Sequence, residues 1–124
     1  MIKKIDHFVI TTSKIQECLE FYKKLGFRIW KSDGRYELYA GDFKINVHIL
    51  HQELMPHATN VQTGSADVCF EVEDIYKFQD LLKDQSIEIE LGIVVRSGVR
   101  GFMKSIYIRD IDGNLLEFCQ YEGM

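Results

Sequence analysis

The feature that most constrains this chain is an internal repeat with a spacing of 60 residues. Phe8 aligns with Val68, and Ile15 aligns with Ile75. In each copy, apolar residues first alternate as in a strand and then recur at helical spacing. A repeat of this kind predicts that the chain contains two copies of one supersecondary unit.

Each copy is predicted to be a βαβββ unit, in which the first strand leads directly into a helix. The first helix is expected to begin at Ser13, with Gln16 completing a capping box, and to end at Gly26. The second is expected from near Asp74 to about residue 84. The other predicted strands cover about residues 28–31, 35–40 and 43–50 in the first copy, and 87–91, 103–109 and 114–121 in the second.

The expected fold class is therefore α+β, with two paired βαβββ modules forming a curved sheet around a cleft. With 124 residues, the chain is too short to give each half an independent large core. We therefore expect a single domain made of two modules, at about residues 1–60 and 61–124.

Charge and cysteine content narrow the classes of partner and the cellular compartment. Fifteen basic and 19 acidic residues give a net charge of -4, which argues against nucleic acid and anionic membranes as partners. The segment at the start lacks the apolar stretch of a signal peptide, and no apolar run is long enough to cross a bilayer. The three cysteines form no CxxC pair, which favours reduced thiols and a cytoplasmic protein.

Four polar residues have the strand parity that points away from the predicted helices: His7, His48, Asp67 and Glu117. His7 aligns with Asp67, and a second spacing of 69 residues aligns His48 with Glu117. Two imidazoles and two carboxylates are suitable ligands for a divalent metal such as Zn, Ni, Mn, Fe or Co. The competing interpretation is that these residues are structural and paired with neighbours, above all the short Asp67.

The segment 92–101 contains three glycines together with Arg96 and Arg100. As a loop, it would be able to close over a substrate and bind a carboxylate or phosphate through both arginines. The competing interpretation is a solvent-exposed loop. Tyr107 is a further candidate for substrate binding, as an aromatic surface.

Three blocks of sequence, at residues 5–9, 21–27 and 109–117, resemble the vicinal oxygen chelate superfamily. This superfamily includes glyoxalase I, extradiol dioxygenases and the fosfomycin- and bleomycin-resistance proteins. The third block is the most specific, although Ile111 stands where the family usually has proline. The resemblance implies paired βαβββ modules around a divalent metal, a small-molecule substrate and a homodimer.

The resemblance places the ligand positions at His7, His48, Asp67 and Glu117, with two departures from the glyoxalase I pattern. His48 stands where glutamate is usual, and Asp67 stands where histidine is usual. We therefore expect a metal-dependent lyase or isomerase of the glyoxalase-like type that chelates neighbouring oxygens of a small substrate, and the two departures weigh against lactoylglutathione. Glu117 is the expected general base, and Asp67 is the alternative.

Two other functions remain open from the sequence. One is a metal-free protein of the bleomycin-resistance type that sequesters a drug or ligand, using aromatic surfaces such as Trp30 and Tyr36. The other is an Fe(II) extradiol-type dioxygenase, for which two histidines and one glutamate supply the ligands.

Overall fold

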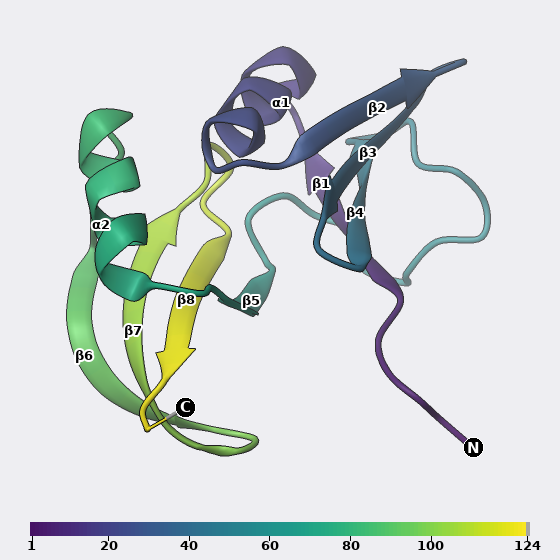
Figure 1. Cartoon of the computed structure of the whole chain (residues 1–124). Helices are drawn as coiled ribbons and strands as arrows, with labels where there is room; N and C mark the ends of the chain where they lie inside the picture. Colours follow the sequence, from purple (N-terminus) through teal and green to yellow (C-terminus); the bar gives the residue numbers. More distant parts are fainter. Residues whose placement is uncertain (124) are drawn as a thin grey trace. The chain divides into compact units, whose positions relative to one another are not determined.

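The computed structural model describes residues 1–123 and divides into two compact units, Met1–Ser65 (unit 1) and Ala66–Met124 (unit 2). Each unit contains four strands and one helix in the order βαβββ (Figure 1). The α+β class and the two modules predicted from the repeat are confirmed.

Unit 1 has its first and fourth strands side by side. Its elements are β1 (His7–Thr12), α1 (Ile15–Lys24), β2 (Arg28–Ser32), β3 (Arg35–Ala40) and β4 (Phe43–Ile49). The sheet order is β1-β4-β3-β2, in which β1 runs parallel to β4 and the other pairs are antiparallel.

Unit 2 repeats this order as β5-β8-β7-β6, with β5 parallel to β8. Its elements are β5 (Asp67–Glu71), α2 (Ile75–Asp84), β6 (Leu91–Gly98), β7 (Gly101–Arg109) and β8 (Leu115–Tyr121). In Figure 1 the helix α2 lies along one side of its own sheet, and it packs against β7 and β8.

Both cores are built from alternate strand residues beneath the helix. Ile45 and Val47 in β4 are 0% and 3% exposed, and Leu116 and Phe118 in β8 are also 0% and 3% exposed. Each such side chain contributes about 1.5–3 kcal/mol by leaving water. The alternation buries one sheet face of each unit and leaves the polar residues between these positions on the opposite face.

The two helices begin differently. Asp74 is the N-cap of α2, as expected, and its carboxylate accepts hydrogen bonds from the backbone N–H groups of Tyr76 and Lys77. The capping box predicted at Ser13 is wrong, because the N-cap of α1 is Lys14 and has no side-chain cap. The backbone N–H of Lys14 donates instead to the Thr12 hydroxyl, so a residue of β1 takes part in the turn.

The strand register corrects the alignment of the last strands. His7 pairs with Lys44, and Asp67 pairs with Leu115, so corresponding residues of β4 and β8 are 71 rather than 69 positions apart. The residue equivalent to Glu117 is therefore Asn46. A shift of two residues keeps every side chain on the same sheet face, so the hydrophobic pattern alone was unable to reveal it.

The expected loop at 92–101 is mostly strand. The strand predicted at 87–91 instead covers Leu91–Gly98 and pairs with β7, leaving a short turn before Gly101. The β-branched run from Ile93 to Val95 favours this pairing, and the glycine before it lies at a register shift. Among residues 1–123, no helix is long and apolar enough to cross a membrane.

Candidate functional site

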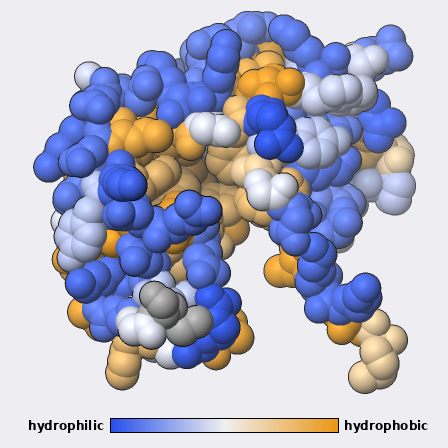
Figure 2. Space-filling view, viewed as in Figure 1, coloured by the Kyte–Doolittle hydropathy of each residue, from blue (hydrophilic) through white to orange (hydrophobic). Residues whose placement is uncertain are grey.

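The candidate residues lie on the sheet face of each unit that is opposite its helix, which we call the helix-free face. Directly opposed residues of neighbouring strands point to the same side of a sheet. The register therefore gives the helix-free face of unit 1 as His7, Val9, Thr11, Arg28, Trp30, Ser32, Arg35, Glu37, Tyr39, Lys44, Asn46 and His48. The helix-free face of unit 2 contains Asp67, Cys69, Glu71, Arg96, Ser105, Tyr107, Leu115, Glu117 and Cys119. Polar side chains cover much of the visible surface of the protein (Figure 2).

His7 is held by the residue before it. Its Nδ1 lies 2.8 Å from a carboxylate oxygen of Asp6 and donates a hydrogen bond to it, and this bond is the main cause of the lowered pKa of Asp6. In this tautomer, Nε2 carries the free lone pair. Metal-binding histidines usually have such a carboxylate partner. The sequence contained this signal in the Asp6-His7 pair, but Asp6 was not identified as a supporting residue.

Asn46 lies two register positions from His7 on the neighbouring strand, because its direct partner in β1 is Val9. The Cα atoms of such diagonal neighbours are about 7–8 Å apart. The side-chain oxygen of Asn46 is buried and has no hydrogen-bond partner among the described residues. This oxygen is available to a ligand, and the sequence prediction missed it.

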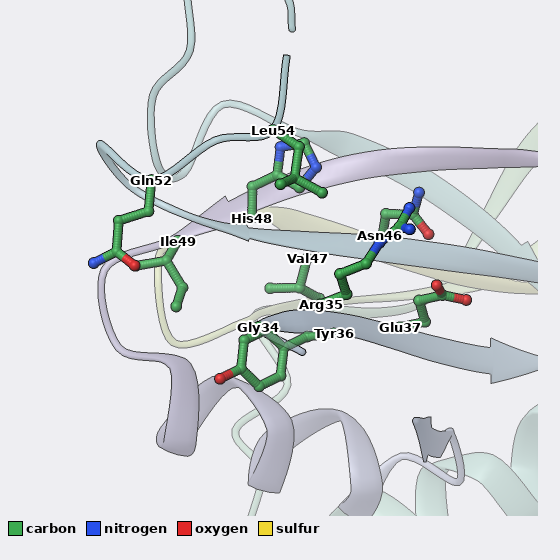
Figure 3. Close-up of a pocket in the computed structure, with 10 residues that line it drawn as sticks. All are labelled: Gly34, Arg35, Tyr36, Glu37, Asn46, Val47, His48, Ile49, Gln52 and Leu54. Carbon is green, nitrogen blue, oxygen red and sulfur yellow. The ribbon is translucent and has the colours of Figure 1, made fainter. Parts of the chain in front are cut away.

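His48 lies further along the same face. Its partner in β1 is Thr11, four positions beyond His7, which corresponds to about 13 Å along the strands. Burial lowers the pKa of His48, so its imidazole is neutral at neutral pH. Figure 3 shows His48 and Asn46 on the side of β4 away from α1.

His48 and Asn46 border a small cavity of about 40 Å³ within unit 1 (Figure 3). A cavity of this size holds water molecules or one small group of a ligand. Its other lining residues are Gly34, Arg35, Tyr36, Glu37, Val47, Ile49, Gln52 and Leu54.

Glu37 lies opposite Asn46 and has its partners within the protein. Its carboxylate accepts hydrogen bonds from the Tyr39 hydroxyl and from Lys44 Nζ, the latter at 2.9 Å. The Tyr39 bond, followed by the Lys44 bond, lowers the pKa of Glu37. Glu37 is therefore an ionised structural group, and Lys44 is engaged in the same ion pair.

Glu117 is the unit 2 equivalent of Asn46, and its surroundings differ from those of Asn46. It lies between Cys69 on β5 and Tyr107 on β7, and its Oε2 is buried without a hydrogen-bond partner among the described residues. Asp67 is exposed and lies two register positions away on β5. The two carboxylates are thus diagonal neighbours, as His7 and Asn46 are in unit 1.

Tyr107 and Arg96 form a pair beside Glu117. Arg96 Nε donates to the Tyr107 hydroxyl at 3.1 Å, and the guanidinium lies 5.5 Å from the ring centroid. Burial is the main cause of the raised pKa of Tyr107, so the phenol remains protonated. Tyr107 therefore presents a neutral hydroxyl next to a carboxylate.

Arg100 is placed differently from the expected clamp. It lies in the turn before β7, where its Nη2 donates to Glu71 at 2.8 Å and its guanidinium lies 4.1 Å from the Tyr121 ring centroid. Arg96 and Arg100 therefore have separate partners, and Arg100 fastens the hairpin to β5 and β8. A substrate-binding role for either arginine stays a prediction.

Within either unit, among residues 1–123, no three His, Cys, Asp or Glu side chains gather closely enough to hold a metal ion. Each unit instead presents two diagonal candidate donors. The unpartnered oxygens of Asn46 and Glu117 and the free Nε2 of His7 are suitable donors for a divalent cation. The donor chemistry therefore fits the metal that the sequence predicted.

The repeated βαβββ units define the class of fold, and sequence comparison identifies the family. Residues 4–118 match the model of the Glyoxalase/Bleomycin resistance protein/Dioxygenase superfamily, and the chain belongs to this family.

Relatives match the chain over nearly its whole length. A glyoxalase domain-containing protein, RDO1 of Mycosarcoma maydis, is 37% identical over 98% of this chain and 70% of its own. Virulence protein STM3117 of Salmonella typhimurium is 40% identical, and its crystal structure covers 98% of both chains with a TM-score of 0.94. A structure from the mobile metagenome of V. pseudocholerae, VPC_CASS1, is 39% identical, covers 99% of this chain and 98% of its own, and has a TM-score of 0.94.

Proposed function

We propose that the chain is a divalent-metal-dependent lyase or isomerase of the glyoxalase-like type, acting on a small molecule with neighbouring oxygens. The observation that carries the proposal is the buried Oε2 of Glu117, which has no partner among the described residues. Leaving a buried carboxylate oxygen unpaired costs free energy, so its presence indicates a bound cation or substrate group. Family membership and the glyoxalase domain named in RDO1 support the same reaction class.

The proposed metal ligands are His7, Asp67 and Glu117, with a fourth donor from β4. His48 was predicted for this fourth position. The register favours Asn46, because Asn46 is the equivalent of Glu117 and lies near His7, whereas His48 lies about 13 Å further along the strands. Two of these candidate donors belong to unit 1 and two to unit 2, and a homodimer stays a prediction.

A bound divalent cation would polarise the chelated oxygens of the substrate and so stabilise negative charge on them. Glu117 is the proposed general base, which takes a proton from the carbon beside a chelated oxygen, and Asp67 is the alternative base. Tyr107 presents its hydroxyl beside Glu117 and is oriented by Arg96, so this pair is suited to position the substrate. A cytoplasmic location stays a prediction from the cysteine content.

A second candidate function is metal-free sequestration of a ligand, as in bleomycin resistance. One observation favours it: Trp30 is 46% exposed on the helix-free face of unit 1 and offers an aromatic surface. The Fe(II) dioxygenase alternative requires two histidines at one ion. The separation of His7 and His48 along the sheet weighs against it.

Metal affinity tests the proposed ligands directly. Titration with Zn²⁺, Ni²⁺, Mn²⁺ and Co²⁺ is expected to show one site per chain, weakened more than about 100-fold in His7→Ala, since even outer-shell changes cost 10–100-fold. Asn46→Ala should weaken binding strongly and His48→Ala only slightly. His51→Ala, in an exposed turn, is the matched control. Unchanged affinity in both His7→Ala and Glu117→Gln would reject the site.

The reaction class is tested by proton exchange. The metal-loaded protein is incubated in deuterated water with small keto acids, hydroxy ketones and thiol adducts of 2-oxoaldehydes, and deuterium uptake is followed by NMR. We expect uptake next to a carbonyl in at least one compound and its loss in Glu117→Gln. Tight binding of aromatic ligands by metal-free protein, with no exchange in any compound, would favour sequestration instead.

A further inference from the structure

The small cavity of unit 1 is bordered by hydrogen-bond donors that the protein itself does not use. Arg35 lines this cavity, and its guanidinium has no hydrogen-bond or ion-pair partner among residues 1–123. The imidazole of His48 and the side-chain amide of Gln52 border the same cavity and likewise lack hydrogen-bond partners in the described part of the chain. Figure 3 shows the side chains of Arg35 and His48 on the same side of the sheet. Donors left free around one cavity are available to a ligand.

The backbone fixes the position of Arg35. Asp33 and Gly34 have φ angles of +50° and +75°, which are typical of a tight two-residue hairpin turn, and Ser32 pairs with Arg35 across this turn. Arg35 is therefore the first residue of β3, and the register places it on the helix-free face. A guanidinium in this position offers two parallel N–H groups, which match the two oxygens of a carboxylate.

The charges around the cavity favour a ligand with a single negative charge. Among the described residues that line it, Glu37 is the acidic one, and Lys44 Nζ forms an ion pair with it at 2.9 Å. The charge of Arg35 is thus left without a counterion, whereas the Glu37 carboxylate opposes a second negative charge on a ligand. A volume of about 40 Å³ exceeds the roughly 10–15 Å³ that one water molecule needs. The cavity therefore suits a carboxylate better than a phosphate.

We propose that Arg35 and His48 bind the carboxylate of the substrate, so that the substrate is a small acid. This inference rests on the proposed function, because it concerns the molecule that the metal would chelate. Asn46, the proposed metal ligand of β4, lies two residues before His48 on the same face, about 7 Å along the strand. The bound carboxylate therefore lies beside the metal ligands of unit 1, several bonds from the chelated oxygens. In an α-keto acid, by contrast, the carboxylate is itself one of the neighbouring oxygens.

Binding of 4-oxopentanoate to full-length, metal-free protein tests this carboxylate site. The neutral counterpart of this keto acid is 4-oxopentanamide, and NMR titration of ¹⁵N-labelled protein follows the His48 ring. We expect the wild type to bind the acid at least about tenfold more tightly than the amide, because only the acid forms hydrogen bonds between two charged groups. Arg35→Gln should lose this preference, and Arg35→Lys should keep part of it. Arg28→Gln is the matched control, since Arg28 is an exposed arginine on the same face outside the cavity.

The outcomes separate this inference from the proposed function. Equal affinity of the wild type and Arg35→Gln for the acid would overturn it, as would a wild type that shows no preference for the acid over the amide. Tighter binding of inorganic phosphate than of the acid would overturn the carboxylate assignment. We expect Arg35→Gln to bind divalent metal as the wild type does. A wild type that binds metal but does not prefer the acid would reject the carboxylate site alone, whereas one that prefers the acid but binds no metal would reject the proposed enzyme alone.

Discussion

Unit 1 and unit 2 bury nearly the same pattern of residues but carry different chemistry on the opposite face. Ile45 and Val47 correspond to Leu116 and Phe118, and all four are buried. On the helix-free faces, a histidine and an amide in unit 1 correspond to two carboxylates in unit 2. The buried positions are thus apolar in both units, whereas the polar positions between them carry different side chains.

Glu37 and Glu117 illustrate the difference, because their carboxylates have different hydrogen-bond partners. Glu37 in unit 1 accepts hydrogen bonds from Tyr39 and Lys44, so its charge is used inside the protein. Glu117 in unit 2 keeps an unpartnered buried oxygen. One acid therefore stabilises its sheet, and the other is available for a ligand.

The core comparison predicts the largest effect. Ile45→Ala and Leu116→Ala each remove a fully buried side chain at an equivalent position, so each should lower the free energy of unfolding by about 2–5 kcal/mol. Urea denaturation measures both values. A loss below about 1 kcal/mol in either variant would show that its unit relaxes around the cavity and that the two cores are not equivalent.

The long hairpin of unit 2 predicts a smaller but sharply defined effect. Gly92 and Gly101 have φ angles of +137° and +134°. Of these two, only Gly92 has atoms within 4 Å of the position that an added Cβ would occupy. A Cβ there would lie 2.8 Å from the backbone oxygen of Ser105 and 2.9 Å from the Cα of Ile106. Gly92→Ala should therefore cost about 2 kcal/mol more than Gly101→Ala, which bears only the backbone strain.

Thermal or urea unfolding of these two glycine variants checks the difference. Equal losses would mean that the β6–β7 pairing adapts to the added methyl group. In that case the register shift at Gly92 would be a flexible feature rather than a fixed one.

The sequence was sufficient to predict the βαβββ repeat and both helices, because periodicity and a cap such as Asp74 are local signals. It was insufficient for the register of β4, since a shift of two residues leaves the pattern of buried positions unchanged. Asn46 was missed for this reason. The pairing of β6 was also missed, because Gly92 interrupts the strand pattern and its role depends on β7.

The comparison of Glu37 with Glu117 predicts that the same change, glutamate to glutamine, has different effects on stability at the two positions. Glu37→Gln should lower the free energy of unfolding by about 1.5–3 kcal/mol, because it weakens hydrogen bonds to a charged group. Glu117→Gln should be neutral or stabilising in metal-free protein, because it removes a charge whose Oε2 has no described partner. Urea denaturation of both variants in a chelating buffer makes the comparison. A large loss in Glu117→Gln would show that Glu117 is structural.

The Glu37 effect should depend on pH. The pKa of Glu37 is lowered from its ordinary value of 4.5, mainly by the Tyr39 hydrogen bond. Ionised Glu37 therefore contributes its full stabilisation at any pH above the pKa that Glu37 has in the unfolded chain. This contribution is lost as the pH falls through the lower pKa that Glu37 has in the folded protein. The difference between wild type and Glu37→Gln should be constant near neutral pH and shrink below about pH 4.5. A difference that persists in acid would contradict the assigned cause.

The measurement that tests the central claim most directly is elemental analysis of wild-type protein and the Glu117→Gln variant, both purified without chelators and then supplied with divalent metals. The proposed function predicts about one tightly held Zn, Ni, Mn, Fe or Co ion per wild-type chain and a large loss in the variant. Wild-type protein without metal, or a variant with equal metal content, would contradict it.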